Sequence, residues 1–395
     1  MTTPAELPWQ QEIVKALVTH QGYTLLKDED YDVRRAVVPS AFLAFIQRTQ
    51  PVLLTRHSAD ALVAGLANAL DRPDLHVPTE RQLDLPSVLD VWRKGFRLGD
   101  DTVRVAYWRP RDAVDPRLMG AYEANGLGVI QELHYDTQAG AEGNRLDLVL
   151  FVNGIPVVTV ELKNQFTGQG TGNAVEQYRC DRSPVAPVFR FPHRAIVHLA
   201  VDRENARMAT RLRGKDTFFL PFNRGKDGGS GNPPLTTIHG EKSSTAYLWD
   251  DFDQIDDRPG MAGTRRIRAA WSRDRLFDIL QSYATLEEPD LTGAERALAP
   301  LEKAQRATLI FPRYHQYDAI DDMLAHTAEH GVGHRYLIKH STGSGKSYTM
   351  AWLAHQLGAL HRDSGQHKVF GTVVIVTDRL QLDSQLRELV RVRPA

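Results

Sequence analysis

Two apolar runs on either side of an Asn-Gly pair place the strongest constraint on the fold of this chain. The runs are 145–152 (RLDLVLFV) and 155–163 (IPVVTVELK), with Asn153-Gly154 between them. Asn-Gly between alternating apolar residues is the strongest local signal for a β-hairpin, because both residues accept a positive φ. The pattern predicts a two-stranded hairpin, with further strands over 129–135 (VIQELHY) and 195–201 (AIVHLAV).

Three ionisable side chains of this hairpin share one face only if the hairpin is irregular. Glu161 and Lys163 are two residues apart, so they lie on the same face of their strand. A strict two-residue turn at 153–154 would set Asp147 opposite Val160, on the other face, whereas a three-residue loop would set it opposite Glu161. We therefore predict an odd-length turn or a β-bulge, which collects Asp147, Glu161 and Lys163 on one face.

These three residue types suit a divalent metal site. Asp147 and Glu161 offer the hard oxygen ligands that Mg²⁺ prefers. A bound Mg²⁺ polarises a scissile phosphate and lowers the pKa of an attacking water. Lys163 would orient that water or stabilise the charge that builds on the phosphate. The competing interpretation is an exposed strand face with a salt-bridged Glu–Lys pair, because surface ion pairs are common.

Residues 340–347 (HSTGSGKS) form a phosphate-binding pattern between a predicted strand and a predicted helix. The apolar runs 335–340 and 371–377, with a helical pattern over 348–360 between them, predict a βαβ unit with a parallel sheet. Glycines let backbone N–H groups wrap a phosphate, Lys346 would place its charge on the β- and γ-phosphates, and Ser347 would bind the Mg²⁺ of ATP. The competing interpretation is a glycine turn with a coincidental lysine. The predicted nucleotide-binding residues of the loop are Thr342, Gly343, Ser344, Gly345, Lys346 and Ser347.

Two flanking segments resemble motifs of helicase motors. The run 311–320 (FPRYHQYDAI) resembles the Q motif, in which Gln316 would read adenine and Arg313 would flank it. The run 373–386 (VVIVTDRLQLDSQL) resembles the motif with which these motors touch the DNA backbone. His340 stands where the common phosphate-loop pattern begins with Gly, and the helicase pattern often lacks that glycine as well.

Together these segments resemble the R (restriction) subunit of type I restriction-modification enzymes, from about 128 to 390 and again in the early run ELPWQQEIVKALVTHQGY. The resemblance implies an α/β fold. A PD-(D/E)xK nuclease domain with a mixed sheet flanked by helices would cover 1–215. A connecting region over 216–295 would lead to a RecA-like helicase domain with a parallel sheet over 296–395. No D-E-x-H or D-E-A-D box follows the phosphate loop, so we expect a truncated motor with an incomplete ATP site.

The resemblance also implies residue roles. Asp147, Glu161 and Lys163 would form the nuclease core, with both carboxylates as metal ligands and Ser347 as a ligand of the nucleotide's metal. The helix that follows often carries Gln and Tyr four residues apart in this family. Here Tyr178 is present, but position 174 is Ala and the glutamine is the adjacent Gln177. Glu12 on the first helix is a further acidic candidate, and Glu6 is an equal one.

The function implied is a type I site-specific deoxyribonuclease. Such an enzyme cleaves double-stranded DNA with Mg²⁺ and couples cleavage to ATP-dependent translocation. Its expected partners are DNA and the methyltransferase (M) and specificity (S) subunits. The alternatives are a stand-alone ExK-type nuclease with a regulatory nucleotide site, and a non-catalytic assembly module.

Charge and composition narrow these expectations. The chain has 48 basic and 49 acidic residues, so any DNA contact would come from local clusters or from a partner. A single cysteine, Cys180, excludes an internal disulfide and fits a reducing cytoplasm. No run approaches the roughly 18 apolar residues of a membrane span, so we expect a cytoplasmic location. Two weaker signals are interpreted as solvated helix faces: Arg265, Arg266 and Arg268 near Trp271, and the pair His326 and His330.

Overall fold

The computed structural model describes most of the chain. The described residues are 7–72, 86–110, 115–136, 144–164, 168–225, 231–237, 240–256, 263–287, 293, 295, 298–362, 367–378, 383, 386–387 and 389–390.

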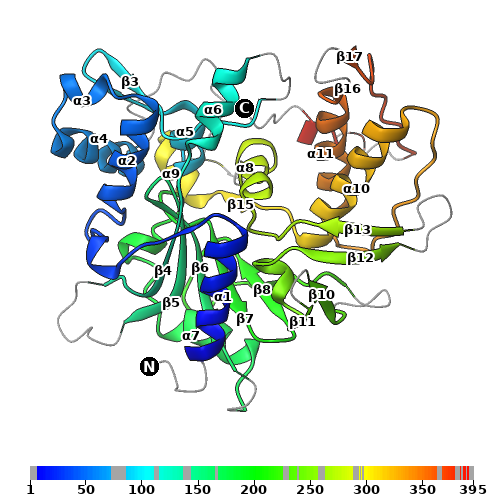
Figure 1. Cartoon of the computed structure of the whole chain (residues 1–395), viewed down its shortest axis with the longest axis horizontal. Helices are drawn as coiled ribbons and strands as arrows, with labels where there is room; N and C mark the ends of the chain where they lie inside the picture. Colours follow the sequence, from blue (N-terminus) through cyan, green and yellow to red (C-terminus); the bar gives the residue numbers. More distant parts are fainter. Residues whose placement is uncertain are drawn as a thin grey trace.

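A seven-stranded mixed sheet organises the N-terminal part of the chain (Figure 1). Its strand order is β1-β4-β5-β6-β7-β8-β9. The β1–β4 and β6–β7 pairs are parallel and the other pairs are antiparallel, which confirms a mixed sheet. The strands are β1 (Thr24–Leu25), β4 (Leu127–His134), β5 (Arg145–Val152), β6 (Ile155–Leu162), β7 (Val197–Val201), β8 (Ala206–Ala209) and β9 (Leu220–Pro221).

The β5–β6 hairpin contains both a tight turn and a bulge. Val152 pairs with Ile155, and the turn residues Asn153 and Gly154 have φ values of 50° and 81°. The register then shifts between Leu150 and Phe151, so Val157 is the extra residue on β6. A β-bulge of this kind moves every later residue of one strand by one position relative to its partner. The predicted irregularity is therefore confirmed as a bulge.

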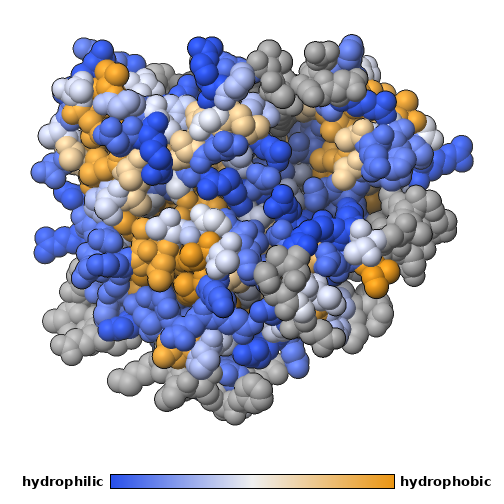
Figure 2. All heavy atoms as spheres, in the orientation of Figure 1, coloured by the Kyte–Doolittle hydropathy of each residue, from blue (hydrophilic) through white to orange (hydrophobic). Residues whose placement is uncertain are grey.

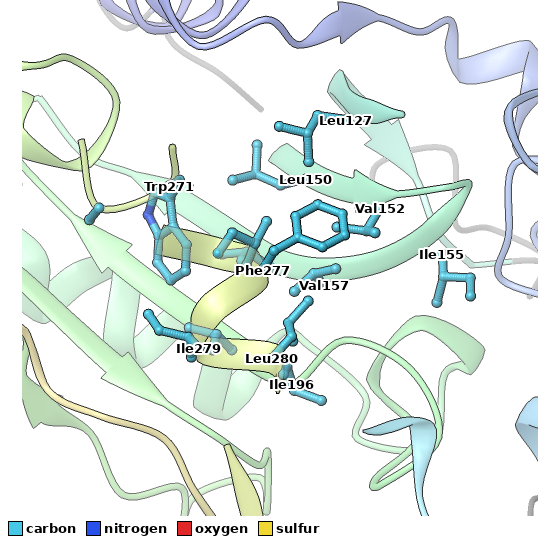
Figure 3. Packing of buried hydrophobic residues seen from close by; sticks show 14 of the residues in the cluster. Leu127, Leu150, Val152, Ile155, Val157, Ile196, Trp271, Phe277, Ile279 and Leu280 are labelled. Atoms are coloured by element: carbon cyan, nitrogen blue, oxygen red, sulfur yellow. The ribbon is translucent and has the colours of Figure 1, made fainter. Parts of the chain in front are cut away.

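Each face of the sheet is covered by helices. On one face, α7 (Thr171–Cys180) places Ala174, Val175 and Tyr178 against Val149 and Phe151. On the other face, α1 (Leu7–His20) and α8 (Arg273–Ser282) share a core with Leu148, Leu150 and Val152 of β5. Figure 3 shows this second core, where Trp271, Phe277 and Leu280 face Leu150, Val152, Val157 and Ile196.

A helical layer lies at the upper left of Figure 1, and the residue before its first helix, Val38, donates its N–H to Gly154 O of the β5–β6 turn at 2.7 Å. Helix α2 begins with Pro39, whose missing N–H costs nothing in the first turn of a helix. Helix α4 follows Ser58, whose side chain accepts a hydrogen bond from the N–H of Ala61 in the first turn. The elements of this layer are α2 (Pro39–Thr49), α3 (Leu53–Arg56), α4 (Ala59–Asp71), α5 (Val88–Lys94), α6 (Pro116–Glu123) and the hairpin β2 (Phe96–Leu98) with β3 (Asp101–Val103).

A small antiparallel sheet of order β11-β10-β12-β13 precedes α8. Its strands are β10 (Leu235–Thr237), β11 (Gly240–Lys242), β12 (Phe252–Asp256) and β13 (Gly263–Ile267). The predicted helix face at 265–268 is wrong, because Arg265 and Arg266 lie on β13, where Arg266 pairs directly with Asp253. Opposite charges at facing positions favour this hairpin, and Arg268 also lies 3.7 Å from a carboxylate oxygen of Asp251.

The C-terminal part is mainly helical. It contains β14 (Thr285–Glu287) paired with β15 (Thr308–Ile310), then α9 (Pro300–Arg306), α10 (Tyr314–His330), α11 (Lys346–Gly358) and a short pair, β16 (His361–Arg362) with β17 (His367–Lys368). His326 and His330 lie on α10 as predicted, with their rings stacked at 4.3 Å. The boundaries at 215/216 and 295/296 stay predictions.

The two strands expected around the phosphate loop are not formed. Residues 335–340 and 371–377 belong to no helix or strand, and they pair with no strand among the described residues. Leu337 is 92% exposed and Val376 is 87% exposed. A strand of a parallel sheet is stable only when neighbouring strands satisfy its backbone and helices cover both faces. The predicted parallel sheet is therefore absent from this part of the described chain.

The molecular surface is mostly hydrophilic on the face drawn in Figure 2, with apolar side chains gathered over the α2–α4 layer and near α10 and α11. Among the described residues, none of the helices has both the length and the apolar character that a membrane span requires.

Candidate active site

Carboxylates from three neighbouring strands meet at one level of the sheet. Leu148 pairs with Val160, so the next residues, Asp147 and Glu161, lie opposite each other. Glu132 of β4 lies beside Asp147, between the two residues that pair with Leu148 and Leu146. The backbone N–H of Leu162 donates to Asp147 Oδ2 at 2.6 Å, which ties the Asp147 side chain to the Glu161 strand.

Burial makes this cluster strongly dependent on nearby positive charge. Asp147 is 9% exposed and Glu161 is fully buried. Burial, followed by the negative charge of Glu161, raises the pKa of Asp147 well above its usual range. Burial also raises the pKa of Glu161, and the charges of Arg182 and Lys163 oppose that rise. Two buried carboxylates at facing positions of neighbouring strands are ionised together only where a cation compensates their charge.

The oxygen atoms left free at this cluster fit a hard cation. Arg182 Nε donates to Glu161 Oε1 at 2.6 Å, whereas Glu161 Oε2 is buried without a hydrogen-bond partner in the described part of the chain. No set of three or more His, Cys, Asp or Glu side chains with metal-binding geometry occurs among the described residues. Two protein carboxylates with water completing the shell is a common arrangement for Mg²⁺, so Asp147 and Glu161 are suited to hold it.

Lys163 follows the end of β6 on the same face as Glu161. Its backbone N–H donates to Val201 O at 2.9 Å, which continues the strand direction past the last residue of β6. Its positive charge lowers the pKa of both Asp147 and Glu161. The predicted placement of Asp147 opposite Glu161 is confirmed by the register, and Lys163, two residues after Glu161, follows on the same face by strand alternation.

A glycine-rich turn and the start of α11 form a second candidate site. Gly343 and Gly345 have φ values of 76° and 81°, and Gly345 is the residue before the first turn of α11. Lys346 Nζ donates to His340 O at 3.0 Å across the loop. The positive end of the helix, the glycine backbone and this lysine together suit a phosphate group. Ser344 is buried with no partner for its hydroxyl among described residues, Thr342 is exposed, and Ser347 is half-buried.

Gln316 connects α10 to this loop. Its Nε2 donates to Gly345 O at 2.9 Å, and its Oε1 accepts from the backbone N–H of Arg313 at 2.9 Å. The Arg313 side chain donates instead to Pro221 O at 3.2 Å. The two residues therefore lie next to the phosphate loop, and their contact with adenine stays a prediction.

Residues 5–217 match the family described as the N terminus of the type I restriction enzyme R protein. The match covers more than half of the chain. The chain belongs to this family. Residues 315–393 also match the SWI2/SNF2 ATPase family.

Two relatives are themselves named as endonuclease subunits of type I restriction enzymes. The HindI subunit of Haemophilus influenzae is 24% identical over 268 residues, which are 66% of this chain and 21% of that protein. A Methanocaldococcus jannaschii protein, a candidate MjaVIIP subunit, is 26% identical over 261 residues, 64% of this chain and 20% of its own length. The chain therefore spans about a fifth of the length of these relatives.

Sequence reasoning missed Glu132 of this R-protein N-terminal domain. Its φ is 55°, and Gln10 Nε2 donates both to Glu132 Oε1 at 2.9 Å and to Asp147 O at 2.6 Å. A positive φ inside a strand is costly for a residue other than glycine, so neighbouring contacts must hold it. The only signal in the sequence is the acidic residue within VIQELHY. The register of β4 against β5 cannot be predicted from the sequence, because the two strands are not adjacent along the chain.

The proposed role of Glu12 is wrong. The α1 face that turns toward the sheet carries Trp9, Gln10 and Ile13, whereas Glu12 is exposed and pairs with Lys242 at 3.3 Å. Helical periodicity explains this result, because residues two apart point about 200° away from each other around the axis. Glu6 lies outside the described residues.

The two candidate site residues on α7, Gln177 and Tyr178, differ in burial: Tyr178 is buried against the sheet, whereas Gln177 lies nearer the surface. Tyr178 Oη and Thr159 Oγ1 lie 2.9 Å apart, and Thr159 Oγ1 lies 2.9 Å from His198 Nδ1. Thr159 precedes Glu161 by two residues, so this polar group lies below the carboxylates on the same face. Gln177 is only half-buried, and its amide makes no hydrogen bond with a described residue.

His198 should make the fold sensitive to acid. Burial lowers the pKa of His198 to about 3, while the unfolded chain has the ordinary value of 6.5. Below pH 6.5 the unfolded state therefore gains a proton that the folded state excludes, and stability falls as the pH decreases. At pH 5 the loss from this residue is about 2 kcal/mol. Urea unfolding of the wild type and His198→Gln at pH 7, 6 and 5 should show a smaller decline in the variant, and an equal decline would contradict the assignment.

Proposed function

We propose that the chain is the N-terminal part of a restriction subunit that cuts double-stranded DNA with Mg²⁺. One observation carries the proposal: the β5–β6 bulge sets Asp147 opposite Glu161, and strand alternation puts Lys163 on the face of Glu161. This is the order and spacing of a PD-(D/E)xK nuclease core. The partnerless Glu161 Oε2 supports a metal ion as the missing neighbour.

Each residue of the core has a distinct task. A bound Mg²⁺ would supply polarisation of the scissile phosphate and a more acidic water. Asp147 and Glu161 would hold that ion, and the N–H of Leu162 keeps the Asp147 carboxylate aligned. The Lys163 ammonium would stabilise negative charge that develops on the phosphate oxygens. Sheet and α7 together exclude bulk water from the carboxylate side of the site.

The phosphate loop supports a second activity, ATP-dependent translocation of double-stranded DNA. Thr342, Gly343, Ser344 and Gly345 would wrap the phosphates, Lys346 would bind their charge, and Ser347 would bind the metal of the nucleotide. Gln316 and Arg313 would lie toward the adenine. The similarity to SWI2/SNF2 ATPases supports a RecA-like motor. The M and S subunits of a restriction complex, in the cytoplasm, are the proposed partners.

A metal-dependent cleavage assay tests the nuclease. The chain is separated by gel filtration, and each fraction is incubated with closed-circular plasmid and Mg²⁺. We expect nicked or linear DNA in the fractions that contain the chain, none in the presence of EDTA, and recovery when excess Mg²⁺ is restored. Cleavage that elutes apart from the chain, or that EDTA leaves unchanged, would contradict the proposal.

A further inference from the structure

A buried arginine controls the surroundings of Glu161. Arg182 lies two residues after α7 and is 5% exposed. Besides its 2.6 Å contact with Glu161 Oε1, its Nη2 donates to Arg145 O at 2.7 Å. Its guanidinium also lies over the Tyr135 ring, 5.5 Å from the centroid. The end of α7 is thereby attached to β5, to β6 and to the segment after β4.

These contacts make the two oxygens of Glu161 unequal. Oε1 receives a charged hydrogen bond from a guanidinium that other groups already fix, whereas Oε2 is buried and has no partner in the described chain. A pair built only for stability would satisfy both oxygens, because an unmatched buried acceptor is costly. The arrangement leaves one oxygen of Glu161 buried and without a partner among the described residues, on a carboxylate that Arg182 holds through its other oxygen.

We propose that Arg182 is a positioning residue that presents Glu161 Oε2 to the catalytic metal. This inference rests on the proposed nuclease function. The guanidinium binds Oε1 and prevents the carboxylate from rotating, so that Glu161 contributes a single oxygen as its ligand. Lysine cannot replace this arrangement, because a single ammonium group lacks the planar fork that reaches both Glu161 and Arg145 O.

Binding of Mn²⁺ alone, followed by its electron paramagnetic resonance signal without DNA or nucleotide, tests the inference on the full chain. The wild type should bind Mn²⁺, and Glu161→Gln should lose that binding. Arg182→Lys should weaken binding by about 10–100-fold, as loss of groups that orient metal ligands does. The matched control is Arg179→Lys, because Arg179 lies three residues before Arg182, in the last turn of α7, but donates to Thr217 O rather than to a carboxylate.

Thermal unfolding without metal identifies variants that have lost their fold. If Arg182→Lys is unfolded, Tyr135→Leu replaces it, since that change removes the ring below the guanidinium and keeps an apolar side chain in the core. We expect a loss of about threefold in Mn²⁺ affinity. A folded Arg182→Lys, or in its place Tyr135→Leu, with wild-type affinity would overturn the positioning role alone. Wild type that binds no Mn²⁺, or Glu161→Gln that binds equally well, would overturn the metal site and the inference together.

Discussion

Asp147→Ala is expected to abolish Mg²⁺-dependent DNA cleavage, and Lys163→Ala to lower its rate by roughly 10²–10³-fold, as loss of a transition-state charge contact does. The two variants should fail for different reasons. Asp147→Ala removes a proposed metal ligand, so metal affinity falls with cleavage. Lys163→Ala leaves both carboxylates in place, so Mn²⁺ binding should persist while the chemical step is slow. Plasmid cleavage rates and Mn²⁺ binding, measured on the same preparations, separate the two effects.

Glu12→Gln is the matched control for these variants. Glu12 belongs to the same domain, but it is exposed and pairs with Lys242 rather than with the site. Its replacement should leave the cleavage rate within about twofold, since an exposed ion pair contributes at most roughly 1 kcal/mol to stability. Equal cleavage by wild type, Asp147→Ala and Lys163→Ala would show that these residues do not form the catalytic site.

Lys346→Ala is expected to weaken ATP binding by roughly 10–150-fold, the equivalent of about 1.5–3 kcal/mol for a hydrogen bond to a charged group. In the structure the Lys346 ammonium donates to His340 O across the loop. We expect a bound phosphate to contact the same ammonium group. Titration of a fluorescent ATP analogue with Mg²⁺ measures this change.

Lys339→Ala is the comparison for that variant. Lys339 is an exposed lysine seven residues earlier in the same segment, so it has the same charge without the place in the loop. Its replacement should leave nucleotide affinity unchanged. Equal weakening by both substitutions would assign binding to general surface charge, and no weakening by Lys346→Ala would contradict the nucleotide site.

The β5–β6 hairpin was predictable because its information is local. The Asn153-Gly154 turn, the alternating apolar residues and the spacing of Glu161 and Lys163 lie within twenty residues. The requirement that three polar groups share a face then led to the bulge, which the register confirms. Local patterns suffice here since turn chemistry and strand alternation act over only a few residues.

Other parts of the site depend on contacts that the sequence does not display. Arg182 and Glu132 reach the carboxylates through the packing of α7 and the register of β4 against β5, and neither follows from spacing along the chain. The strands expected at 335–340 and 371–377 fail for a related reason. Their apolar composition is correct for a buried strand, but pairing requires neighbours that the pattern itself cannot supply.

The position of α8 constrains how such a chain could be assembled from parts. Trp271 and Phe277 complete the core beneath β5 and β6, while Trp352 of α11 donates to Tyr283 O, next to the end of α8. Arg275 of α8 lies within 3.6 Å of carboxylates of Asp318 and Asp321 on α10. Helix α8 thus packs against the face of the sheet opposite the carboxylates and also contacts α10 and α11, so it joins the sheet to the helices around the phosphate loop. An exchange of either part between related chains would therefore have to preserve both packing surfaces of α8.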